Sequence, residues 1–152
     1  MTGPVVVRRA TAEDVPAIVA MLADDELGAR RESPGDLGPY LRAFEAIDAA
    51  DHELLAVAER DGAVVGTLQL TVLRGLSRGG ASRAQIEAVR VASSTRGQGL
   101  GERLVRWAVE EARARGCAIV QFTSDKSRVD AHRFYRRLGF AQSHEGFKLE
   151  LS

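Results

Sequence analysis

The sequence predicts an α+β (mixed α/β) fold, with a central mixed, mostly antiparallel sheet flanked by helices. Three strand-like runs follow one another through short turns in the middle of the chain, which is typical of an antiparallel meander. A strand then leads into the longest helical pattern and on to another strand, which indicates one β-α-β crossover. Helical periodicity also fills two segments ahead of the meander. The expected element order is β-α-α-β-β-β-α-β-α-β-β, in a single domain over residues 1–152.

The first fifty residues are expected to form a strand, a helix, a loop and a second helix. Val5–Arg8 is rich in β-branched residues, which favour strands. Thr11 is followed three residues later by Asp14, a variant of the capping box that opens a helix. The stretch from Gly28 to Gly38 has no periodicity and predicts a loop. The two helices are expected from Thr11 to about Leu27 and around Tyr40–Ala49.

The next forty residues predict three strands. Two apolar runs flank the turn Arg60-Asp61-Gly62, and Asp-Gly supplies the positive φ angles that tight hairpins need. A second turn is expected at Gly75–Gly80. The strands are expected at Leu54–Glu59, Val64–Leu73 and Ala84–Val91.

The last third of the chain predicts the main helix and a smaller set of elements. Apolar residues follow helical spacing from Leu100 to Arg115, and Gly116 is placed as the C-terminal cap. The later elements are expected to be a strand at Cys117–Thr123, a helix at Asp130–Leu138 closed by Gly139, and a final strand pair formed by Phe140–Ala141 and Phe147–Leu151.

Composition narrows the classes of function. The sequence has no apolar stretch near the 18 residues of a membrane span and no leader-like segment after Met1, so we expect a cytoplasmic protein with no membrane partner. The single cysteine, Cys117, excludes an internal disulfide, and the ligands of a structural zinc site are lacking, so no metal is expected. A formal net charge of zero and few aromatic residues argue against nucleic acid as a partner.

The zero net charge hides a basic block. Residues 90–137 hold 11 Lys/Arg and 5 Asp/Glu, whereas residues 1–89 hold 9 and 14. A basic block in an otherwise acidic chain indicates a local anionic ligand. By charge alone, arginines on solvated helix faces explain the block equally well.

A glycine-rich turn joins the strand Val89–Val91 to the start of the main helix. It reads Arg96-Gly97-Gln98-Gly99-Leu100-Gly101. Glycines let a ligand approach the backbone, and the free N–H groups of the first helical turn attract an anion. The chain has no G-x-x-x-x-G-K-[ST], and the turn has G-x-G-x-G spacing instead of G-x-G-x-x-G, so ATP and nicotinamide sites of these types lose their support.

The turn resembles the R-G-x-G-[IL]-G pyrophosphate loop of the GNAT superfamily of N-acetyltransferases, and the resemblance extends over almost the whole chain. Ile86-Glu87 ahead of the loop, the segment Ala131–Phe140 with its Phe-Tyr-x-x-x-Gly-Phe core, and the opening Arg8-Arg9-Ala10-Thr11 are similar to that family. The resemblance implies a GNAT-like sheet, acetyl-CoA as cosubstrate, and transfer of its acetyl group to a primary amine by direct attack. It also implies a homodimer.

The resemblance further implies which residues bind the cofactor. The strand before the loop would pair with the pantetheine arm, and the loop, with Arg96 beside it, would hold the pyrophosphate. Arg133, Arg136 and Arg137 of the second motif would lie near the adenosine end, where one or two of them would meet the 3′-phosphate. Arg128 departs from the family, because many members carry Asn there, and Ala88 replaces a residue that is often acidic or polar. The implied set is Val89, Arg90, Val91, Arg96, Gly97, Gln98, Gly99, Leu100, Gly101, Glu102, Arg128, His132, Phe134, Tyr135 and Arg137.

Two residues are implied to be catalytic. By resemblance, the hydroxyl of Tyr135 lies near the cofactor sulfur, and Glu87 is the base that takes a proton from the amine, directly or through water. Strand alternation predicts that Glu87 shares one face with Val89 and Val91. The alternative readings are a core tyrosine with a satisfied hydroxyl and a solvated strand glutamate.

The acceptor, a small molecule or a peptide, is not identified by any motif. We expect the segments Gly28–Gly38 and Gly75–Ser82 to shape its site. A second class of function is a non-catalytic acetyl-CoA-binding sensor or structural module of the same fold. The presence of both Glu87 and Tyr135 argues against that alternative.

Overall fold

The computed structural model describes residues 3–152, which form two compact units. The first unit ends at Gln121 and the second runs from Phe122 to Ser152. The first unit contains the whole sheet, and the second contains helix α6 (Val129–Arg137).

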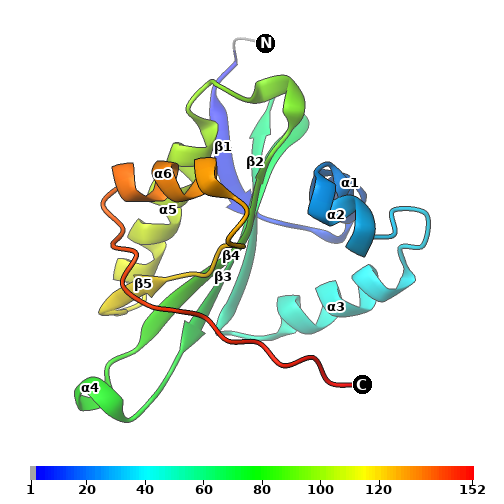
Figure 1. Cartoon of the computed structure of the whole chain (residues 1–152). Helices are drawn as coiled ribbons and strands as arrows, with labels where there is room; N and C mark the ends of the chain where they lie inside the picture. Colours follow the sequence, from blue (N-terminus) through cyan, green and yellow to red (C-terminus); the bar gives the residue numbers. More distant parts are fainter. Residues whose placement is uncertain (1–2) are drawn as a thin grey trace. The chain divides into compact units, whose positions relative to one another are not determined.

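The sheet of the first unit is mixed and mostly antiparallel, as the sequence predicts (Figure 1). Its strands lie in chain order and are β1 (Val5–Arg9), β2 (Glu53–Arg60), β3 (Ala63–Leu73), β4 (Arg83–Val91) and β5 (Ile119–Gln121). The first four strands pair antiparallel, and only β4 and β5 are parallel. Because the parallel pair needs a crossover, the main helix connects β4 to β5.

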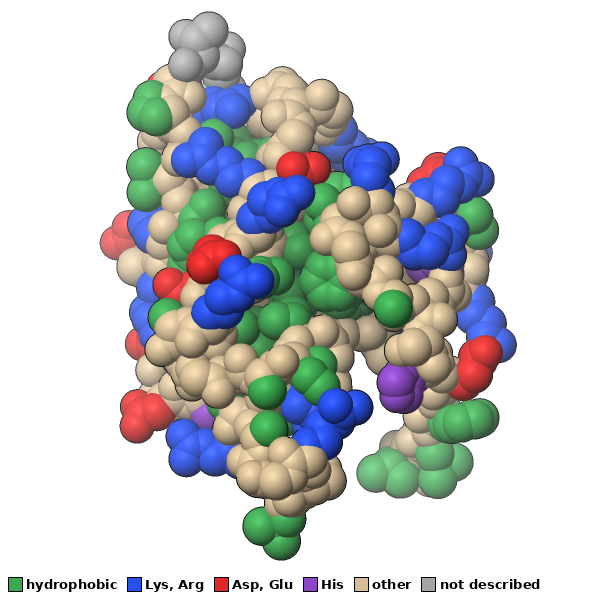
Figure 2. All heavy atoms as spheres, turned by 90° about the vertical axis from the view of Figure 1, so that its left-hand side faces the viewer, with side chains coloured by type: hydrophobic (Ala, Val, Ile, Leu, Met, Phe, Trp, Pro, Cys, Tyr) green, Lys and Arg blue, Asp and Glu red, His purple; other side chains and the backbone are tan. Residues whose placement is uncertain are grey.

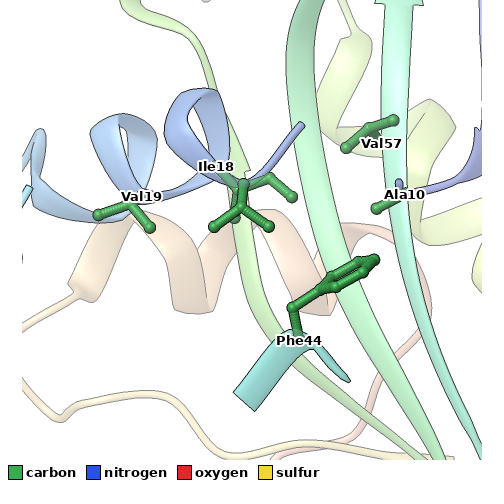
Figure 3. Packing of buried hydrophobic residues seen from close by; sticks show 6 residues of the cluster. Ala10, Ile18, Val19, Phe44 and Val57 are labelled. Atoms are coloured by element: carbon green, nitrogen blue, oxygen red, sulfur yellow. The ribbon is translucent and has the colours of Figure 1, made fainter. Parts of the chain in front are cut away.

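Helices cover both faces of this sheet. Helix α5 (Leu100–Ala114) packs on β3 and β4, where Leu104 is fully buried. Gly66 on β3 permits this close approach, because a Cβ there would lie 2.8 Å from Cδ1 of Leu104. Helices α1 (Val15–Ala23) and α3 (Gly38–Ala49) cover the opposite face, where Ile18, Val19 and Phe44 pack against Val57 of β2 (Figure 3).

The capping box at the start of the first helical segment is confirmed. A 3-10 turn at Ala12–Asp14 leads into α1, and the Asp14 carboxylate accepts hydrogen bonds from the Thr11 N–H at 2.7 Å and from Arg8 at 2.8 and 3.1 Å. The Arg8 hydrogen bond lowers the pKa of Asp14 below its ordinary value, and the Thr11 N–H acts in the same direction. A depressed folded-state pKa means that this carboxylate stabilises the fold above pH ~4, and that the contribution is lost as the pH falls through the folded-state pKa.

The two turns of the meander are confirmed. Asp61 and Gly62 have φ angles of 51° and 80°, the left-handed pair that a two-residue hairpin requires. The second turn contains the short helical segment α4 (Ser77–Gly80), in which Arg78 and Gly79 also have positive φ. These turns fix the register of β2, β3 and β4.

The first helix is shorter than expected, and part of the expected loop is helical. Helix α1 ends at Ala23 because Asp24 leaves the helical conformation with ψ of 34°. Asp25 then caps a new helix, α2 (Glu26–Arg31), by accepting a hydrogen bond from the Gly28 N–H at 2.5 Å. The prediction of a continuous helix to Leu27 and a loop from Gly28 was therefore wrong, since two adjacent aspartates end one helix and start another.

The final strand pair predicted from the sequence is not formed. Helix α6 is confirmed, with Gly139 at φ of 100°, but residues 140–152 form neither helix nor strand, and β5 is limited to three residues. Phe147, Leu149 and Leu151 alternate as in a strand, yet their exposed fractions are 94%, 85% and 90%. Alternation predicted a strand, but a strand also requires a ladder partner, which sequence periodicity does not supply.

Candidate functional site

Strand β4 contains a bulge directly before the glycine-rich turn. Ala88 has a φ of 54°, and the pairing of β4 with β3 shifts there, from Gln69 opposite Glu87 to Thr67 opposite Arg90. Opposed residues in a sheet share a face, and Thr67 and Gln69 lie two residues apart. Glu87 therefore shares its face with Arg90.

The prediction that Glu87 lies on one face with Val89 and Val91 was wrong. The extra residue at the bulge reverses the alternation, as a bulge does in any strand pair. The sequence gives no local signal for it, because Ala88 is not a residue type that favours positive φ.

The bulge coincides with an open edge of β4. Strand β5 pairs with β4 only at Arg83, Ala84 and Gln85. Within residues 3–152, the part of β4 from Ile86 to Val91 has no strand on its β5 side. Backbone N–H and C=O groups on such an edge can pair with an extended ligand. Val89, Arg90 and Val91, the predicted pantetheine-binding residues, lie on this edge.

The glycine-rich turn leads from this edge to the N-terminus of α5. A 3-10 turn at Ser93–Thr95 precedes Arg96, and Gly97 and Gly99 have φ angles of 81° and 75°. Gly99 is the residue before the helix, so the N–H groups of Leu100, Gly101 and Glu102 fall in its first turn, where backbone donors have no partner within the helix. A Cβ at Gly97 or Gly99 would meet no atom within 4 Å. These donors and this space fit a pyrophosphate group.

Side chains around the turn differ in what they offer a ligand. The Leu100 side chain is buried, so only its backbone is available, and Glu102 pairs with Arg106 at 3.0 Å. The Gln98 side chain accepts a hydrogen bond from Arg60 at 2.7 Å. The space-filling view in Figure 2 shows Lys and Arg side chains spread among apolar and acidic ones. Thus Arg60, which bonds to Gln98, and Arg96 within the turn itself place two guanidinium groups beside the backbone donors.

Two aspartates between α1 and α2 contact arginines of the predicted cofactor set. Asp24 Oδ2 lies 3.6 Å from Arg96 Nη2, and Asp25 Oδ2 lies 3.5 Å from Arg90 Nε. Sequence reasoning did not assign a role to either aspartate. Their adjacency, which also ends α1, was the signal that could have drawn attention to them.

The Glu87 carboxylate lies on an exposed part of the sheet face. Gln85, two residues earlier on β4, donates a hydrogen bond from Nε2 to Glu87 Oε1 at 2.6 Å. Glu87 itself is exposed, which leaves its carboxylate accessible to a ligand. Sequence reasoning missed Gln85, although a polar residue at i−2 in a strand shares the face of the candidate base.

The second unit holds the remaining predicted residues on and beside α6. The Tyr135 ring packs with Phe122, Phe134 and Phe140, at centroid distances of 4.1, 5.1 and 6.1 Å. The Arg137 guanidinium lies 5.6 Å from the Phe134 ring centroid, a cation–π contact. These contacts hold the Tyr135 ring in an aromatic cluster.

The start of α6 is organised around Asp125. The Arg128 N–H donates a hydrogen bond to the Asp125 carbonyl at 3.0 Å, and His132 Nε2 lies 3.0 Å from the same oxygen. Arg128 and His132 thus belong to one local turn. Of the two predicted catalytic residues, Glu87 lies in the first unit and Tyr135 in the second.

No helix in residues 3–152 combines the length and apolar character of a membrane span. Within the same residues, no group of three or more His, Cys, Asp or Glu side chains has a metal-binding arrangement.

Comparison with known proteins connects this geometry to a family. The model of the Acetyltransferase (GNAT) family matches residues 16–140. An aminoalkylphosphonate N-acetyltransferase of Salmonella typhimurium is 34% identical over 145 residues, covering 92% of this chain and 87% of that protein. A glucosamine 6-phosphate N-acetyltransferase of Trypanosoma brucei brucei is 30% identical, covering 86% of this chain and 93% of that protein.

A solved structure is similar over nearly the full length. The crystal structure of a transcriptional regulator from Bacillus halodurans C-125 has a TM-score of 0.93 and 46% identity, covering 97% of this chain and all of that one. The family match includes the glycine-rich turn, the bulged strand and α6. The chain belongs to the GNAT acetyltransferase family and is an acetyl-CoA-dependent N-acetyltransferase.

Proposed function

We propose that this protein transfers the acetyl group of acetyl-CoA to a primary amine by direct attack, with Glu87 and Tyr135 as its catalytic residues and with no covalent enzyme intermediate. The observation that carries the proposal is the open edge of β4, which runs through a bulge into a glycine-rich helix N-terminus. The strand edge offers N–H and C=O groups to an extended ligand, and the helix N-terminus next to it offers N–H groups to an anionic part of the same ligand.

The residues predicted to bind the cofactor divide between three tasks. The backbone of Val89–Val91 offers strand-like hydrogen bonds along the pantetheine arm. The N–H groups from Gln98 to Glu102 and the Arg96 side chain offer donors to the pyrophosphate. Arg137, together with Arg133 and Arg136 on the same helix, lies nearer the adenosine end, where one or two of these arginines would meet the 3′-phosphate. Arg128, His132 and Phe134 are the other residues of the second motif that would contact the cofactor. The thioester of acetyl-CoA supplies the activated acetyl group.

Glu87 acts on the attacking amine, and Tyr135 acts on the leaving thiolate. An alkylamine has a pKa of about 10.4, so at neutral pH the acceptor must lose a proton before it attacks, and the Glu87 carboxylate takes that proton directly or through water. A thiol has a pKa near 8.5, below the ~10 of tyrosine, so the Tyr135 hydroxyl stabilises the leaving thiolate by a hydrogen bond without having to donate its proton completely.

For the acceptor, we propose a small molecule with a primary amine. Two of this chain's relatives are named for small amines, an aminoalkylphosphonate and glucosamine 6-phosphate. Peptide amines are the alternative that an acceptor screen would distinguish. We further propose that the chain forms one cytoplasmic acyltransferase domain, works as a homodimer, and uses no metal, nucleic acid or membrane partner.

Glu87→Gln tests the proposed base. The variant is expected to lower kcat by ~10²–10⁴ at pH 7, and the loss should shrink toward pH 10, where more of the acceptor is already neutral. The measurement is the release of CoA thiol as a function of pH. Glu53→Gln is the matched control, because Glu53 is a glutamate on β2 that accepts its hydrogen bond from Gln69. Equal impairment of Glu87→Gln across pH 7 to 10 would remove Glu87 from the role of base.

A further inference from the structure

Three polar side chains form a hydrogen-bonded row across β4 and β5. Gln121 on β5 lies opposite Gln85 on β4, and Glu87 follows Gln85 on the same face. Gln121 Nε2 donates to Gln85 Oε1 at 3.2 Å, and Gln85 Nε2 donates to Glu87 Oε1 at 2.6 Å. The two glutamines are half-buried, whereas Glu87 is exposed. The row therefore runs from the covered part of the sheet to the candidate base.

The chemistry of Glu87 dictates how both amides are turned. An ionised carboxylate can only accept hydrogen bonds, so Gln85 must point its NH₂ group toward Glu87. Its carbonyl oxygen then points the other way and needs a donor. The NH₂ group of Gln121 is that donor. Each amide thus has one orientation that satisfies its neighbour.

We propose that Gln121 and Gln85 are positioning residues that hold the Glu87 carboxylate in a single orientation. This proposal rests on the proposed function, in which Glu87 is the base. Gln85 holds Oε1 and thereby directs Oε2 to the acceptor amine. A glutamate side chain has several rotatable bonds and Glu87 is exposed, so without this contact its carboxylate samples many positions. A misplacement of about 1 Å costs up to 10²-fold in rate.

The test begins with Gln85→Leu, which keeps the bulk of the side chain and removes the donor. We expect kcat to fall about ten-fold to a hundred-fold, with the KM for acetyl-CoA and the melting temperature unchanged. Gln69→Leu is the matched control, since Gln69 lies directly opposite Glu87 on β3 and shares its face, but donates its hydrogen bond to Glu53 and not to Glu87. It should retain nearly the wild-type kcat.

Two substitutions at Gln121 separate amide orientation from packing. Gln121→Glu has almost the shape of glutamine, but it presents a carboxylate to the Gln85 carbonyl, which favours turning the Gln85 NH₂ group away from Glu87. Gln121→Leu removes a donor without competing for that NH₂ group. We expect Gln121→Glu to lower kcat more than Gln121→Leu does. A purely structural role of Gln121 predicts the reverse order, because glutamate is closer in shape to glutamine.

A double-mutant cycle distinguishes failure of the proposed positioning role of Gln85 from failure of the proposed base. If Glu87 is the base and Gln85 positions it, Gln85→Leu has no further effect on kcat in the Glu87→Gln background. If Glu87→Gln impairs turnover but Gln85→Leu does not, or if the two losses are additive, Gln85 does not position Glu87. The assignment of Glu87 as the base then still holds. If Glu87→Gln retains full turnover, Glu87 is not the base, and the positioning role proposed for Gln85 and Gln121 is wrong as well.

Discussion

Gly99→Val is expected to abolish detectable binding of acetyl-CoA while the protein stays folded. Gly99 has a φ of 75°, which a β-branched residue strongly disfavours, so the backbone before α5 would change and its N–H groups would no longer converge. The new side chain would also occupy the space beside these donors, where the protein places no atom within 4 Å. Isothermal titration with acetyl-CoA measures the loss.

The opposite end of the same helix provides the control for Gly99→Val. Gly116 follows α5, has a φ of 79°, and would also place a Cβ in open space. Gly116→Val therefore imposes a similar backbone strain, about 1–3 kcal/mol, far from the turn. It should lower the melting temperature about as much as Gly99→Val does and still bind acetyl-CoA. Unchanged affinity in Gly99→Val would show that the turn does not hold the pyrophosphate.

Tyr135→Phe is expected to lower turnover by ~10²–10⁴ with little change in the affinity for acetyl-CoA. The substitution keeps the ring that packs against Phe122 and Phe134, so the aromatic cluster should remain. Only the hydroxyl that would stabilise the thiolate is lost. Single-turnover kinetics together with titration of acetyl-CoA separate chemistry from binding.

The only other tyrosine of the chain is the control for this prediction. The Tyr40 hydroxyl accepts a hydrogen bond from the Ser33 N–H at 2.8 Å and donates to Glu32 at 2.9 Å, so Tyr40→Phe also removes a bonded hydroxyl. Because Glu32 and Ser33 lie in the segment expected to shape the acceptor site, Tyr40→Phe can change the KM for the amine, but it should leave kcat close to the wild-type value. Full activity of Tyr135→Phe would require another donor for the leaving thiolate.

The sequence predicted the parts of the fold whose signals are local. The Asp61-Gly62 hairpin, the apolar stripe of α5 and the glycine-rich turn each depend on residues close together in the chain, and each is present. The fold class follows from their order. The family resemblance added the cofactor and the reaction, which no local pattern supplies.

The features that the sequence did not predict depend on contacts or on strain. The bulge at Ala88 arises from pairing with β3, and it changes which face Glu87 occupies. The row through Gln85 to Gln121 depends on the parallel register of β4 and β5. The final strand pair is the opposite case, a feature that was predicted but is not formed. The alternating pattern at Phe147 and Leu149 is present, but within residues 3–152 they have no strand to pair with.

The initial-velocity pattern of the wild-type enzyme tests direct transfer to the amine most directly. A panel of primary amines, screened by release of CoA thiol and by product mass, first supplies an acceptor. If an amine accelerates the release of CoA thiol, the protein is not a non-catalytic acetyl-CoA-binding sensor. Varying acetyl-CoA at several fixed concentrations of that amine should then give intersecting double-reciprocal lines, with no acetylated enzyme in intact-mass spectra when the amine is omitted. Parallel lines together with an acetylated protein would contradict direct attack, because they are the signature of a covalent intermediate.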